Sequence, residues 1–60
     1  MDHYYDVFVK YHDEKEETVV ERMLTYSEAI VFVNFLLRER KKHFDGNMKN
    51  SHYPDYVRIE

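Results

Sequence analysis

Histidines and carboxylates are the side chains whose types and spacing first suggest chemistry in this sequence. His43 and His52 flank a segment that also contains Asp45, and imidazole with carboxylate is a ligand set that Zn²⁺ accepts. Such a site needs the intervening loop to fold back, and no i,i+4 pair fixes the ligands. His3 and His12 lie at opposite ends of one expected strand, too far apart to share an ion. We therefore expect no metal site and no cofactor.

The other chemistry-bearing residues form no catalytic pattern. The chain has no cysteine, which excludes disulfides, zinc ribbons and thiol nucleophiles. Neither of its serines, Ser27 and Ser51, lies in a nucleophile elbow, and a single glycine cannot build a phosphate-binding loop. A 60-residue chain also has little room for the concave site that catalysis needs. We expect a protein that is not an enzyme and has no small-molecule substrate.

The first element that positions these side chains is a strand over residues 4–11. This segment is rich in aromatic and β-branched residues that alternate in character, which is typical of a half-buried strand. One face carries Tyr5, Val7, Val9 and Tyr11, and the other carries Tyr4, Asp6, Phe8 and Lys10.

A second strand is predicted over residues 18–24, after a charged turn at 12–17. The short connection makes the pair an antiparallel hairpin. Two assignments of its inner face stay open. In one, Val20 and Leu24 point inward with Arg22 at the margin; in the other, the inward set is Val19, Glu21 and Met23.

A helix is predicted from near Thr25 to near Phe44. Thr25 and Glu28 have the spacing of a capping box, in which each side chain binds the other residue's backbone amide. Basic residues gather in the run 38–43, where the helix dipole favours them, and Gly46 is expected to end the helix in a left-handed conformation. At about 100° per residue, the expected core arc holds Ala29, Val33, Leu36, Leu37 and Phe44, with Tyr26 and Ile30 at its edge.

A polar loop over 47–54 and a last strand over 55–60 complete the chain. Val57 and Ile59 are expected to face inward, and Tyr56 and Arg58 outward. The fold class is α+β, a single ββαβ domain over residues 1–60, with a three-stranded antiparallel sheet of order 2-1-3 and the helix on one face. The alternative places the third strand beside the second and parallel to it, through a right-handed crossover.

Charge is unevenly distributed along the chain. Residues 1–30 hold eight acidic against three basic residues, and residues 31–60 hold six basic against four acidic. This asymmetry predicts an acidic end and a basic end. The basic run 38–43 is expected to be a solvated helix terminus. No run approaches the ~20 apolar residues of a membrane span and no signal-peptide pattern begins the chain, so we expect a cytoplasmic protein without membrane contact.

Val31, Phe32 and Phe35 form an apolar stripe outside the expected core arc. One thin sheet cannot cover both sides of a helix, and adjacent exposed aromatic residues often mark an interaction site. We expect this stripe to bind a protein partner or a second copy of the chain, most simply as an isologous homodimer. The alternative is that the segment 45–53 folds over it.

The open face of the sheet is the second surface left over. By alternation it presents Tyr4, Phe8, Lys10, Tyr56 and Arg58. Aromatic rings flanked by cations on an open sheet stack the bases of single-stranded nucleic acids. Against this, the chain carries a net charge of −3 and has no RNP-like segment.

The helix start from Thr25 to Ala29, following a hairpin, resembles that of many small phage and bacterial proteins. Compact phage-encoded inhibitors of host enzymes, including some that bind bacterial RNA polymerase, are similar in size and in having one helix on a three-stranded sheet. The resemblance carries over no functional residue. We expect a small, non-catalytic interaction module of this phage-like kind, a homodimer that regulates or inhibits a larger partner; the alternative is a single-stranded nucleic-acid binder.

Overall fold

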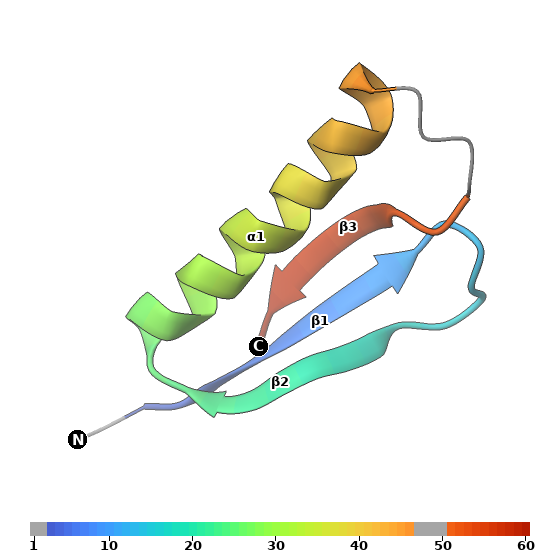
Figure 1. Ribbon diagram of the computed structural model, residues 1–60. Helices are drawn as coiled ribbons and strands as arrows, with labels where there is room; N and C mark the ends of the chain where they lie inside the picture. Colours follow the sequence, from blue (N-terminus) through green and yellow to red (C-terminus); the bar gives the residue numbers. More distant parts are fainter. Residues whose placement is uncertain (1–2, 47–50) are drawn as a thin grey trace.

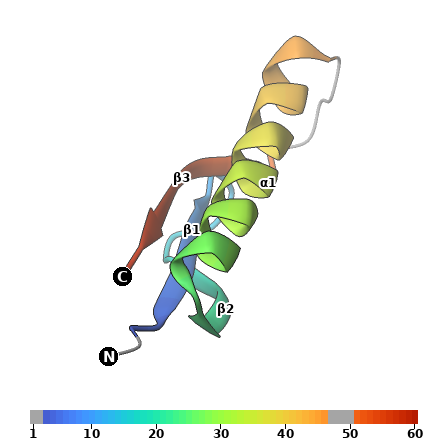
Figure 2. The ribbon, with the colours of Figure 1, turned by 90° about the vertical axis from the view of Figure 1, so that its left-hand side faces the viewer.

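The computed structural model describes residues 3–46 and 51–60. Its elements are β1 (Tyr5–Tyr11), β2 (Thr18–Leu24), α1 (Tyr26–Asp45) and β3 (Pro54–Ile59). The strands form one antiparallel sheet of order β2-β1-β3, and α1 lies on one face of it (Figures 1 and 2). The ββαβ fold with strand order 2-1-3 is therefore confirmed, and the alternative that pairs the third strand with the second is wrong.

β1 is the central strand and its alternation is confirmed. Val7 and Val9 are fully buried, while Tyr5 and Tyr11 pack against the core from the strand ends. β3 begins at Pro54, one residue earlier than expected, and Pro54 pairs with Tyr11. A proline is tolerated there because it is the first residue of an edge strand.

β2 is irregular where it pairs with β1. The register shifts between the pairs Tyr5/Leu24, Val7/Glu21 and Phe8/Val19, and Met23 has a positive φ of 60°. The Met23 N–H donates to the Asp6 carboxylate at 3.1 Å, so a side chain accepts this backbone hydrogen bond.

The structure shows which face of β2 points inward. Leu24 is buried and Val20 packs against the core, so this set is confirmed and the alternative inward set Val19, Glu21 and Met23 is wrong. Arg22 does lie at a margin, with its guanidinium 3.6 Å from Asp6.

The start of α1 is as predicted from the sequence, and its end differs from the prediction. The Thr25 N–H donates to Glu28 Oε1 (2.9 Å) and the Glu28 N–H donates to Thr25 Oγ1 (3.3 Å), so the capping box is confirmed. Gly46 does cap the other end, through its N–H to the Lys42 carbonyl, but with φ −98° and ψ −174°. The expected left-handed stop is wrong. A Cβ at Gly46 would lie 2.9 Å from the Lys42 oxygen, so this position needs glycine for space.

The helix is rotated about its axis relative to the expected core arc. Ala29 and Leu36 are buried, and Phe32 and Val33 pack beside them. Leu37 and Phe44, expected inside, are 44% and 60% exposed. Apolar residues occupy about 260° of the helix circumference, counted at ~100° per residue. The pattern therefore does not fix where the buried arc is centred, and contact with the sheet decides it.

The acidic turn at 12–17 and the basic end of α1 lie at the same end of the molecule (Figure 1). The expectation of an acidic end opposite a basic end is wrong. The topology explains the difference, because α1 runs antiparallel to β2 and so reaches the end where β1 stops and the turn begins. The basic side chains Arg38, Arg40, Lys41 and Lys42 are exposed there, as expected for a solvated helix terminus.

Candidate protein-interaction surface

The stripe Val31, Phe32 and Phe35 lies on one flank of α1. Val31 and Phe35 are one turn apart and are 66% and 56% exposed. Phe32 differs from the expectation, since its ring is half-buried and packs against the core. Together the three side chains line a shallow apolar hollow of about 280 Å³.

The segment that the alternative placed over the stripe packs mainly against other residues in its described part, and only His52 shares a hollow with Phe35. Tyr53 stacks on His43, with ring centroids 4.0 Å apart, and contacts Phe44 edge-on. His52 stacks on Tyr11 at 4.0 Å. These contacts close the end of the molecule and leave Val31 and Phe35 exposed. Residues 47–50 lie outside the described ranges.

Arg58 dominates the open face of the sheet. Its guanidinium lies 4.3 Å from the centre of the Phe8 ring. Arg58 Nε and a second guanidinium nitrogen donate to the two Glu17 oxygens at 2.6 and 2.9 Å, and Arg58 also donates to Glu60. These hydrogen bonds raise the pKa of Arg58 and lower that of Glu17.

The other polar groups of this face are also engaged. A hydrogen bond with Glu17 raises the pKa of the Tyr56 phenol. Lys10 Nζ donates to the Tyr11 carbonyl at 2.7 Å and lies 3.8 Å from Asp55. The structure thus brings together Phe8, Arg58, Tyr56 and Glu17 as one cluster, while Tyr4 lies just outside β1 and is 52% exposed.

Sequence reasoning missed Glu17, which turns from the hairpin onto the sheet face. An acid at the last position before a strand is the available signal, but its partner lies 41 residues away in the sequence. Its effect is electrostatic: the carboxylate neutralises the cation that a phosphate backbone would need.

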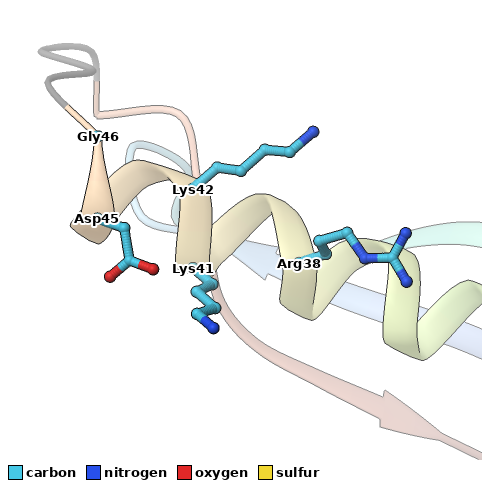
Figure 3. A pocket seen from close by; sticks show the side chains of 5 residues that line it. All are labelled: Arg38, Lys41, Lys42, Asp45 and Gly46. Carbon is cyan, nitrogen blue, oxygen red and sulfur yellow. The ribbon is translucent and has the colours of Figure 1, made fainter.

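The basic end of α1 forms a hollow lined by Arg38, Lys41, Lys42, Asp45 and Gly46. Figure 3 shows the three cationic side chains pointing in different directions. Anion binding needs donors that converge on one point. Arg40 instead lies over the Phe44 ring, 5.1 Å from its centre.

His12, His43 and His52 contact carboxylates or aromatic rings. His12 Nδ1 lies 3.0 Å from Asp55, and His52 Nδ1 lies 3.0 Å from Asp13. Tyr53 stacks against both His12 and His43. Within residues 3–46 and 51–60, no group of three His, Cys, Asp or Glu side chains could hold a metal ion. The arrangement considered from sequence, with His43, Asp45 and His52 together, does not form.

No protein-family model, curated protein or solved structure matches this chain. In the part of the chain that the structure describes, no helix has the length and apolar character needed to cross a bilayer.

Proposed function

We propose that this chain is a small, non-catalytic protein-interaction module that forms a homodimer and regulates or inhibits a larger partner protein. The observation that carries the proposal is the exposed hollow at Val31, Phe32 and Phe35 on the flank of α1. Burying this apolar surface against protein is favourable at about 25 cal/mol per Å².

The shape of the molecule supports self-association. The radius of gyration is 12.4 Å, whereas a compact domain of this length has about 10 Å. The Cα atoms span 45 by 22 by 11 Å, so the molecule is long and only two thin layers deep. Such a shape leaves a small interior, and association is one way for a short chain without disulfides to bury more surface.

Sedimentation at micromolar concentration tests the dimer. Wild type is expected to dimerise and Phe35→Glu to sediment as a folded monomer, because the new charge would be buried without a partner. Leu37→Glu is the matched control, since Leu37 is also exposed but lies about 160° around the helix from Phe35. A monomeric wild type, or a Phe35→Glu variant that dimerises normally, contradicts the proposal.

The regulatory role is supported by the character of the described hollows. Three of them are shallow and each is lined by one short segment, as expected of a surface that binds protein more than substrate. A fourth lies between α1 and the ends of β1 and β3, and Phe35 of the stripe also lines it. If the chain regulates a larger protein, adding it in purified form should change the activity of the protein it binds. Stoichiometric binding without any change in activity would contradict regulation.

The alternative is single-stranded nucleic-acid binding through Tyr4, Phe8, Lys10, Tyr56 and Arg58. It is less well supported, because Arg58 and Lys10 face carboxylates. It predicts salt-sensitive oligonucleotide binding that weakens in Phe8→Ala.

A further inference from the structure

The stripe is bounded by two opposite charges placed symmetrically along the helix. Glu28 lies seven residues before Phe35, and Lys42 lies seven residues after it. Seven residues are about two turns, so the three side chains share one flank of α1 to within ~20° per step. Each charge is therefore about 10 Å along the axis from Phe35, at 1.5 Å per residue.

Building on the proposed homodimer, we propose that two copies of α1 pack antiparallel, side by side, with the two-fold axis at Phe35. Glu28 of each copy then lies opposite Lys42 of the partner subunit, and by symmetry the pair occurs twice. A parallel arrangement would instead place Glu28 against Glu28 and Lys42 against Lys42. The charges favour the antiparallel one, as do the helix dipoles.

Both charges are available for this contact. Glu28 is exposed, and its hydrogen bond from the Thr25 backbone occupies one carboxylate oxygen while lowering its pKa. The Lys42 side chain is 62% exposed and lies 3.7 Å from Glu39 of its own helix. An exposed pair of this kind contributes little, so Lys42 can turn to a better-placed carboxylate.

The fold also leaves space for a second helix on this flank. α1 contacts β3 and β1 more extensively than β2, and Figure 1 shows it displaced from β2. Figure 3 shows Lys42 pointing to the β2 side of α1 and Lys41 to the opposite side. The partner helix would therefore lie beside α1, above β2 and the half-buried Val20.

The surface area is consistent with a missing contact. The chain exposes 4695 Å², whereas a compact monomer of 7.5 kDa exposes roughly 4,200 Å². A second copy packed on the stripe would bury part of this excess.

Charge-neutral variants test the orientation by sedimentation equilibrium. Glu28→Gln retains the capping box, which accepts glutamine, and Lys42→Gln removes the opposite charge. Each variant removes both interchain pairs, so we expect each to weaken the dimer about three- to fivefold. Lys41→Gln is the matched control, with the same charge change on the other side of the helix, and should have little effect.

The double variant sharpens the test, because Glu28→Gln with Lys42→Gln should weaken the dimer no more than either change alone. If the dimer forms but Glu28→Gln and Lys42→Gln both tighten it, α1 packs parallel and the antiparallel arrangement is overturned. The antiparallel arrangement is also overturned if Lys42→Gln changes the dissociation constant no more than Lys41→Gln does. A wild type that remains monomeric overturns the homodimer itself, so the two failures are distinguishable.

Discussion

Arg58 shows how one residue changes the character of a surface. Its position opposite Phe8 follows from strand alternation, and a cation over a ring is what a nucleic-acid binder would present. Glu17 and Glu60 rule out that role, because together they occupy both edges of the guanidinium, which then cannot also bind a phosphate. The Glu17 contact makes the stability of the fold depend on pH.

Replacing Glu17 with Gln tests this pH dependence. Because Arg58 lowers the pKa of Glu17 below its ordinary value of 4.5 in the folded state, the ionised carboxylate stabilises the fold above that pH. This contribution is lost as the pH falls from 4.5 through the lower folded-state pKa. In thermal melts, Glu17→Gln should be less stable than wild type at pH 7, with the difference shrinking at acid pH. Glu16→Gln should match wild type, and a pH-independent difference would contradict the argument.

Met23 and Gly46 have exchanged the conformations their residue types favour. Met23 has the left-handed φ of 60°, whereas the single glycine has an extended backbone and is required by the closeness of the Lys42 carbonyl. The Met23 side chain is 69% exposed, so its packing contributes little to offset the backbone strain.

Met23→Gly is therefore expected to stabilise the protein. Relief of the left-handed conformation is worth about 1–2 kcal/mol, and the added chain entropy of glycine costs about 0.5–1 kcal/mol, leaving a net gain of about 0.5–1 kcal/mol. Urea denaturation measures it. Met23→Ala removes the same side chain but keeps the Cβ. An equal gain in stability in Met23→Ala would show that relief of the left-handed backbone is not the cause.

At the scale of elements, the bounds of α1 were predictable from the sequence and its buried face was not. The capping box and the helix bounds were predictable because they depend on neighbours three or four residues away. The centre of the buried arc was not, because Leu37 and Phe32 are equally apolar and only the position of β1 and β3 decides between them. The bulges of β2 and the contact of Glu17 with Arg58 likewise depend on residues distant in sequence.

Thr25→Ala tests the contribution of the helix start. Loss of the hydroxyl leaves the Glu28 N–H without its acceptor, which should cost about 1 kcal/mol and lower the melting temperature by about 4–8 °C in a domain this small. Thr25→Ser keeps the oxygen and should restore most of the loss. Equal melting temperatures for the alanine and serine variants would show that the cap contributes little.

The whole molecule combines a small interior with a large exposed apolar surface. In the described ranges the buried apolar core is Val7, Val9, Leu24, Ala29 and Leu36, with Pro54 beside it. The buried faces of β1 and β3 were predictable from alternation, whereas alternation alone does not decide which strand β3 pairs with. The thinness of the molecule was not, because it depends on how far α1 is displaced across the sheet.

If unfolding is coupled to dissociation of the proposed dimer, the melting temperature should rise with protein concentration. Scanning calorimetry of wild type at concentrations from about 10 µM to about 1 mM is expected to show this rise. Phe35→Glu should melt at a temperature independent of concentration. A wild-type melting temperature that does not change would indicate that the folded unit is the monomer.

The irregular pairing of β2 also affects whether copies of the chain can assemble beyond the proposed dimer. An edge strand with free backbone groups can recruit further strands and grow into fibrils. Two register shifts and the left-handed Met23 bend and twist this edge, which makes it a poor template for another strand. If the proposed homodimer forms through α1, association ends at two copies there, and the irregular β2 edge does not offer a second, open-ended route of assembly.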